Sequence, residues 1–140
     1  MKTVEITPEA IQAAAGVLPQ DGPITMLNLL RYKDRAEYDG PIDLPPGSGR
    51  EVYFGRYVPA FNKVAAGANI KVFWVANVLA AVVAPAGERW DDVAIVEYPD
   101  YATFRRVVES PEYAADAALH RRAALEDWRL IATLKMDLPG

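Results

Sequence analysis

The sequence predicts an α+β protein in which one antiparallel β-sheet is covered by helices. The first observation is the stretch 71–99, where two halves rich in Val, Ile, Phe, Trp and Tyr flank Pro-Ala-Gly-Glu, so that a hairpin of two long strands is expected. The second is the alternation of apolar residues in 24–32 and 128–136. The third is a helical period between these strands, in 51–66 and 101–125.

Length and composition indicate one globular domain. The chain has 140 residues, of which 51% are hydrophobic and 24% charged, and we expect residues 1–140 to form a single domain. The N-terminus lacks the hydrophobic region of a signal peptide. The longest apolar run, Val72–Ala84, is shorter than the roughly 20 residues that span a bilayer, so we interpret it as a buried strand. A cytoplasmic protein without a membrane partner is expected.

The charge and the absence of cysteine exclude further classes. A net charge of −4 offers no basic surface, so nucleic acid is not an expected partner. Without cysteine the chain has no disulfides, thiolate metal ligands or thiol nucleophiles.

The first element is a short helix that ends at about Ala15. Thr7 is suited to cap it, and Pro8 is favoured at the first helical position. Glu9 complements the positive end of the helix dipole, and Gly16 ends the helix.

The next element is the strand Ile24–Tyr32. Alternation places Met26, Asn28, Leu30 and Tyr32 on one face, with Leu27, Leu29 and Arg31 on the other. Because both faces are largely apolar, we expect this strand to be covered on both sides.

A long loop and a helix follow. Residues 33–50 are rich in Gly and Pro, and loops beyond about 12 to 15 residues are often functional, so this one is a candidate lid or partner arm. In the helix 51–66, Tyr53, Tyr57 and Phe61 form one stripe. Pro59 must kink this helix or begin a new helical segment, because it has no N–H to donate.

The hairpin and the last elements complete the pattern. On the first hairpin strand we assign the Trp74 face to a dimer surface and pocket wall, and the opposite face, with Phe73 and Val75, to the support of the helices. Asp100 is suited to cap a helix to about Glu109. Ser110, Pro111 and Glu112 open another helix to about Leu125, which precedes the final strand Trp128–Met136.

After the N-terminal helix, the expected order is strand, helix, strand, strand, helix, strand. This β-α-β-β-α-β order is the split pattern of ferredoxin-like folds, with an antiparallel sheet covered by helices on one face. The strands are too apolar for the other face to contact water. We therefore predict a homodimer, a dimeric α/β barrel, in which two sheets pack face to face.

Four segments carry a resemblance to a known family. They are Met26–Tyr32, Ile95–Phe104, Ser110–Tyr113 and Ala123–Thr133, and in order and spacing they resemble the family called domain of unknown function thirteen-thirty. The resemblance implies a ferredoxin-like protomer of the dimeric α/β-barrel superfamily. That family has no settled activity, so no catalytic residues are carried over. The N-terminal helix, the Pro-rich loop and Pro59 depart from the family pattern.

The sequence contains few residues that could form a catalytic triad or a metal site. The only histidine is His120, and the only serines are Ser48 and Ser110, of which Ser110 is needed as a helix cap. One histidine cannot form a transition-metal site, and neither a metal nor a cofactor is expected. A haem held by His120 alone would rest on analogy with other dimeric α/β-barrel proteins.

Polar and aromatic side chains suggest a pocket for a small organic ligand. The wider set is Asn28, Tyr32, Tyr53, Tyr57, Trp74, Asn77, Trp90, Tyr98, His120 and Arg122. From it we predict that the ligand contacts Asn28, Tyr32, Tyr53, Tyr57 and Trp74. Asn28 is the strongest member, because an unpaired amide in an apolar strand costs about 1 to 3 kcal/mol. Tyrosines at helical spacing are also common in cores, and a solvated helical position suits His120.

Three hypotheses for function remain open. The first is a homodimer that binds a small organic molecule in a mainly apolar pocket. The second is an enzyme, a cofactor-independent oxygenase or an isomerase, in which His120 or Tyr57 moves protons and Asn28 holds an oxyanion. The third is a structural or interaction protein whose pocket is filled by side chains.

Overall fold

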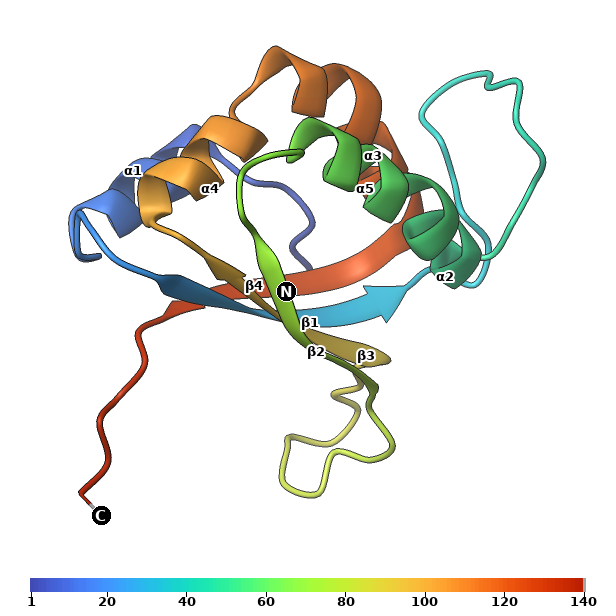
Figure 1. Ribbon diagram of the computed structural model, residues 1–140. Coiled ribbons are helices and arrows are strands. Elements are labelled where there is room, and N and C mark those ends of the chain that lie inside the picture. The colour runs from blue at the N-terminus through green and yellow to red at the C-terminus, as the bar shows by residue number, and fades with distance from the viewer. Residues whose placement is uncertain (140) are drawn as a thin grey trace.

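The computed structural model describes residues 1–139 and contains a four-stranded antiparallel sheet (Figure 1). The strands are β1 (Ile24–Tyr32), β2 (Lys71–Asn77), β3 (Asp92–Tyr98) and β4 (Leu125–Thr133). They lie in the order β2-β3-β1-β4, and every neighbouring pair is antiparallel. The helices lie on one face of the sheet (Figure 1). This arrangement confirms the predicted α+β class and its ferredoxin-like order of elements.

The helices agree with their predicted positions to within a few residues. They are α1 (Pro8–Ala15), α2 (Gly49–Val52), η1 (Tyr53–Tyr57), α3 (Val58–Val64), α4 (Tyr101–Val108), η2 (Tyr113–Ala117) and α5 (Ala118–Ala124), where η marks a π-helical turn. None of the helices in residues 1–139 has the length and apolar character needed to cross a membrane.

Pro59, where the sequence predicted either a kink or a new helical segment, coincides with the change from the π-turn η1 to α3 inside a continuous helical run. It lies in the first turn of α3, and the preceding turn η1 is π-helical, with the Val58 N–H bonded to the Tyr53 carbonyl. A π-turn absorbs the hydrogen bond that a proline cannot make, so α2, η1 and α3 continue as one helical segment from residue 49 to residue 64.

Side-chain caps begin the helices. The Thr7 hydroxyl accepts from the Ala10 N–H at 3.1 Å, and the Asp100 carboxylate accepts from the Thr103 N–H at 2.8 Å. Ser110 caps in the same way, which confirms the three predicted caps. The sequence analysis missed Ser48, whose capping box with Glu51 starts α2 two residues earlier than expected.

The predicted hairpin is shorter than expected. β2 ends at Asn77, and residues 78–91 form an exposed loop on the side of the sheet away from the helices (Figure 1). The interpretation of Val72–Ala84 as a buried strand is therefore wrong: β2 is an edge strand and is largely exposed, and beyond residue 77 there is no strand, with Leu79 93% exposed. The physical reason is the opposite half of the hairpin, where residues 85–91 include a proline, a glycine and charged residues and cannot supply an apolar strand partner.

The last strand starts earlier than predicted. β4 begins at Leu125 rather than Trp128 and ends at Thr133 rather than Met136. Its first residues include Glu126 and Asp127, whose charges hid the strand from a search for apolar alternation.

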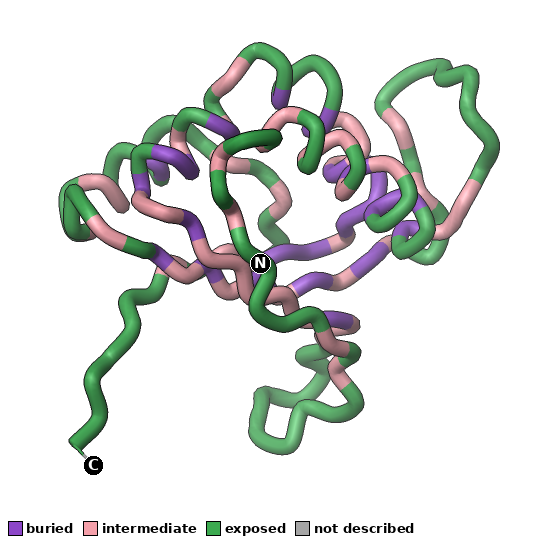
Figure 2. The backbone as a smooth tube through the Cα atoms, viewed as in Figure 1, coloured by how far each residue is buried: buried purple, intermediate pink, exposed green. Residues whose placement is uncertain are grey.

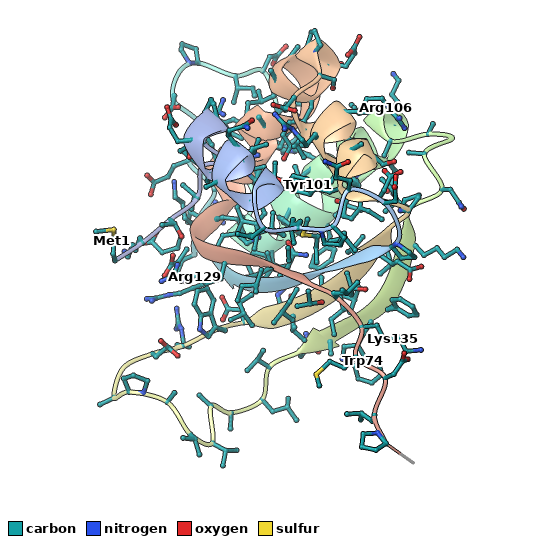
Figure 3. The ribbon with its side chains drawn as sticks, turned by 90° about the vertical axis from the view of Figure 1, so that its left-hand side faces the viewer. Met1, Trp74, Tyr101, Arg106, Arg129 and Lys135 are labelled. Carbon is teal, nitrogen blue, oxygen red and sulfur yellow. The ribbon has the colours of Figure 1, made fainter. Side chains whose placement is uncertain are left out.

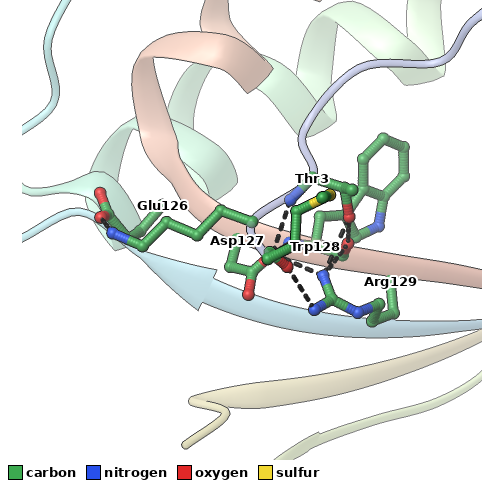
Figure 4. A network of polar contacts seen from close by, with 7 residues as sticks. Thr3, Glu126, Asp127, Trp128 and Arg129 are labelled. Carbon is green, nitrogen blue, oxygen red and sulfur yellow. Dashed lines mark hydrogen bonds and ion pairs between the residues drawn. The ribbon is translucent and has the colours of Figure 1, made fainter.

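The N-terminal residues protect the outer edge of β4. The Thr3 N–H donates to an Asp127 carboxylate oxygen at 2.8 Å, and the Thr3 hydroxyl donates to the Trp128 carbonyl at 2.6 Å (Figure 4). Arg129 donates to the Met1 carbonyl at 2.8 Å. This segment occupies hydrogen-bonding groups that an edge strand would otherwise expose.

The two faces of the sheet differ in their cover. Buried residues gather between the sheet and the helices, whereas the loop 78–91 and the C-terminal segment are exposed (Figure 2). On the uncovered face, the register places Trp74, Ile95, Leu27 and Ile131 in one row across the four strands. Trp74 is 60% exposed.

Candidate functional site

A cavity of about 350 Å³ lies between the sheet and the helical segment α2-η1-α3. Among residues 1–139, no charged side chain lines it. Its polar lining comes from Asn28, Tyr53, Tyr57, Asn62, Asn69 and Tyr98, and its larger apolar lining from Leu30, Phe54, Val58, Phe61, Ile70, Val72, Val75 and Val96. The cavity is therefore suited to an uncharged molecule with a mainly apolar body.

Asn28 is held rigidly at the centre of β1. Its amide N–H donates to the Ala94 carbonyl at 3.2 Å, and its amide oxygen accepts from the Trp128 indole N–H at 3.0 Å. An amide carries two N–H donors, so one remains without a partner among residues 1–139. The sequence correctly indicated that this buried amide needs partners, but it did not identify Trp128, which lies 100 positions away.

The π-turn η1 presents two tyrosines to the cavity. The rings of Tyr53 and Tyr57 lie 5.0 Å apart, and Phe61 continues the stripe at 6.1 Å from Tyr57. All three line the cavity, so the predicted stripe on one helical face is confirmed.

A buried chain of hydrogen bonds supports Tyr57 from behind. The Tyr57 and Tyr113 hydroxyl oxygens lie 2.8 Å apart, and an Arg121 guanidinium N–H donates to the Tyr113 hydroxyl at 2.6 Å. Arg121 is only 2% exposed, and its guanidinium stacks over the Trp128 ring at 5.3 Å. Arg121 also donates to the Val4 carbonyl at 3.2 Å, so its charge is well solvated by the protein.

The phenols at the cavity stay protonated. Burial raises the pKa of Tyr53, Tyr57 and Tyr98, and the nearby Tyr113 raises these pKa values further. Each hydroxyl is therefore a hydrogen-bond donor over the whole physiological pH range.

Tyr32 does not line the cavity, contrary to the prediction. Its hydroxyl donates to Asp92 at 2.6 Å, and the same carboxylate accepts from Arg50 at 2.7 Å and from Asn77 at 2.9 Å. Asp92 is 1% exposed, and these donors compensate its burial. Burial, with the hydrogen bond to Asp92, raises the pKa of Tyr32.

Trp74 lies on the opposite face of the sheet from Asn28. In the ladder Trp74 pairs with Ile95, whereas Ala94 and Val96, the neighbours of Ile95, line the cavity. Figure 3 shows Trp74 on the side of the sheet away from the helices. The predicted assignment of Trp74 to the uncovered face is confirmed, but its place in one pocket with Asn28 is wrong.

Strict alternation fails in β2 before Trp74, at Phe73. The register shifts between Val72 and Trp74, so the strand carries a bulge at this point. Val72 and Val75 line the cavity, and strict alternation from Phe73 could not place both on one face.

His120 lies away from the cavity, beneath the loop that follows β1. Its Nδ1 is 2.7 Å from the Tyr38 hydroxyl, which also accepts from Arg56 at 3.1 Å. Burial and the positive charge of Arg56 lower the pKa of His120. The half-buried His120 is thus neither solvated, as favoured above, nor in contact with the cavity.

The loop 33–48 packs on its own chain. The Lys33 N–H donates to the Ala124 carbonyl at 2.9 Å, and the Glu37 N–H donates to the Ala123 carbonyl at 3.0 Å. Its outer part, residues 39–46, is exposed. Of the other members of the wider set, only Tyr98 lines the cavity, and Asn77, Trp90 and Arg122 do not.

A second cavity of about 300 Å³ lies beneath α1. It is lined by Ile6, Ile11, Met26, Phe104 and Leu130, among others. Its one tyrosine, Tyr101, already donates to the Ile11 carbonyl at 2.8 Å. Within residues 1–139, no three His, Cys, Asp or Glu side chains lie close enough together to hold a metal ion.

Comparisons with known proteins identify relatives over the whole chain. Two crystal structures of RPA0582, a protein of unknown function from Rhodopseudomonas palustris, are similar to it with a TM-score of 0.83 each. The methylated form is 34% identical, covering 99% of this chain and 98% of the other, and the second structure is 31% identical, covering 99% and 100%.

A more distant structure shares the fold alone. It is a DABB family protein with a ferredoxin-like fold from Mesorhizobium loti, 11% identical with a TM-score of 0.51, covering 83% of this chain and 99% of the other. The comparison with curated proteins gives no match. The model of the domain of unknown function DUF1330 matches residues 51–134. The chain therefore belongs to the DUF1330 family, as the four resembling segments indicated.

Proposed function

We propose that the protein binds a small, uncharged organic molecule in the cavity between the sheet and α2-η1-α3. The observation that carries this proposal is an uncharged lining around about 350 Å³, which lies within the range of known ligand sites. Pockets of this type combine a large apolar surface with a few placed polar groups.

Two hydroxyl groups at the cavity support the proposal. Tyr53 and Tyr98 both line it, and their hydroxyls have no hydrogen-bond partner in the described part of the chain. Within residues 1–139 the only enclosed side-chain nitrogen or oxygen without a partner is Arg31 Nε, so both hydroxyls border open space. A ligand with a polar group would satisfy them.

A titration with 2-ethylnaphthalene tests the proposal. The expected result is saturable binding, followed through the NMR signals of Val58, Val72 and Val96. Val75→Trp should block binding, because Val75 lines the cavity from the edge strand β2. Val82→Trp, a similar enlargement in the exposed loop, should leave binding unchanged. Equal affinity in the wild type and in Val75→Trp would refute a site in this cavity.

We further propose that two copies associate through their uncovered sheet faces. The row that includes Trp74, Leu27 and Ile131 supports this, because an exposed apolar patch on a sheet is a common interaction surface. The loop 78–91 and the C-terminal segment extend on this side and would contact the second copy (Figure 1).

Sedimentation equilibrium tests the association. The expected mass is twice the 15.4 kDa of one chain. Trp74→Asp should shift the mass toward the monomer, whereas Phe54→Asp, a matched change at an exposed aromatic residue on the helical side, should not. A wild-type monomer at micromolar concentration would contradict the proposal.

A further inference from the structure

The surroundings of Tyr57 and Tyr113 favour one direction for the hydrogen bond between their hydroxyls. Tyr113 is 3% exposed, and in residues 1–139 its hydroxyl contacts only the Arg121 guanidinium and the Tyr57 hydroxyl. A guanidinium donates and never accepts, so Arg121 cannot receive the Tyr113 proton. A buried O–H donor requires an acceptor. Tyr113 does not line the cavity, so only donation to the Tyr57 oxygen gives its proton an acceptor, and this direction leaves the remaining proton on the residue that borders the cavity.

This direction leaves the Tyr57 proton without an acceptor in the described part of the chain. Tyr113 is the donor in their shared bond, so Tyr57 must direct its own O–H elsewhere. Tyr57 lines the cavity, whereas Tyr113 does not. The Tyr57 O–H is thus available to an acceptor atom in the cavity.

The Asn28 amide adds a second donor whose orientation is also defined. The Trp128 indole N–H can only donate, so the atom it contacts is the amide oxygen. The Ala94 carbonyl can only accept, so the amide nitrogen lies on its side. The other amide N–H has no partner within residues 1–139, and Asn28 lines the same cavity as Tyr57.

We propose, on the basis of the binding function above, that the ligand carries a carbonyl oxygen and that the Tyr57 O–H donates to it. In the part of the chain that the structure describes, the lining offers hydroxyl and amide donors but no carboxylate and no cation, which favours a neutral acceptor over an acid or an amine. The buried charge of Arg121 polarises the Tyr113 and Tyr57 hydroxyls in sequence, which strengthens the donation by Tyr57. The raised pKa of Tyr57 keeps its proton in place.

A matched pair of probes tests the proposal. 2-Acetylnaphthalene and 2-ethylnaphthalene have similar shapes, and only the first carries a carbonyl group. We expect Tyr57→Phe to reduce the affinity for the ketone about 2- to 10-fold relative to the affinity for the hydrocarbon, because one hydrogen bond is lost. Tyr38→Phe, outside the cavity, should leave the ratio of the two affinities at its wild-type value.

The outcomes separate this inference from the binding function itself. If neither probe binds, the binding function fails and the inference fails with it. If both bind and Tyr57→Phe leaves their ratio unchanged, the cavity is a ligand site but the assignment to Tyr57 is overturned.

If Tyr57→Phe does not fold, infrared spectroscopy of the wild-type protein tests the same hydrogen bond without a variant. The C=O stretch of bound 2-acetylnaphthalene should lie at a lower frequency than in cyclohexane, because the carbonyl accepts a hydrogen bond. A frequency equal to that in cyclohexane would overturn the inference.

Discussion

Replacing Asn28 by leucine should destabilise the protein, although the change makes an apolar strand more apolar. The substitution removes the acceptor of the Trp128 indole N–H and the donor to the Ala94 carbonyl. Trp128 is 8% exposed, so its N–H would lose its partner in a largely buried place. A buried donor without a partner costs about 1 to 3 kcal/mol, and the gain from burying leucine instead of an amide offsets part of this.

The net loss in the free energy of unfolding should therefore be about 1 to 2 kcal/mol. For a chain of this size, that corresponds to a decrease in Tm of about 3 to 8 °C. Urea denaturation followed by circular dichroism measures the effect, at one protein concentration because self-association would shift the transition.

A double-mutant cycle with Trp128→Phe isolates the hydrogen bond from changes in packing. In the double variant both partners are gone, so its loss of stability should be smaller than the sum of the single losses by about 1 kcal/mol. An Asn28→Leu variant as stable as the wild type, or two additive single losses, would refute the reasoning.

Two further predictions concern the surroundings of the loop 33–48. Burial and Arg56 lower the pKa of His120, so the unfolded chain binds a proton more readily than the folded one, and stability should fall as the pH decreases below the ordinary histidine pKa of about 6.5. His120→Gln should reduce the difference in unfolding free energy between pH 7.5 and pH 5.5, and an unchanged difference would assign the effect to other groups. Gly49→Ala should cost about 3 kcal/mol or prevent folding, because a Cβ there would lie 2.8 Å from the Lys33 backbone nitrogen and closer still to the Lys33 and Ala124 carbonyl oxygens. A Tm of Gly49→Ala within about 2 °C of the wild-type value would contradict this, because it would mean that the neighbouring backbone moves at little cost.

Local sequence signals predicted the order of the elements. Helix caps such as Thr7 and Asp100 act within three residues, and the alternation in β1 reports directly on its two faces. Residues 78–84 continue the apolar run of β2, so no local signal marks the end of the strand. Where the strand ends depends on whether the opposite half of the hairpin can pair with it.

The candidate site was predicted only in part, because its polar contacts join distant residues. Periodicity placed Asn28, Tyr53 and Tyr57 on faces that meet at the cavity. The bond between Asn28 and Trp128 spans 100 positions, and no periodic pattern reports on such a pair. The bulge in β2, which places Val72 on the same face as Val75, likewise depends on pairing with β3. The role of these residues in binding stays a prediction.

A crystal structure with bound 2-acetylnaphthalene would test the central proposal most directly. The account predicts the naphthyl ring between Phe61 and Val75, with the carbonyl oxygen within hydrogen-bond distance of the Tyr57 hydroxyl and near the free Asn28 N–H. A ligand seated instead beneath α1, or one in the predicted cavity whose carbonyl oxygen faces away from Tyr57, would contradict it.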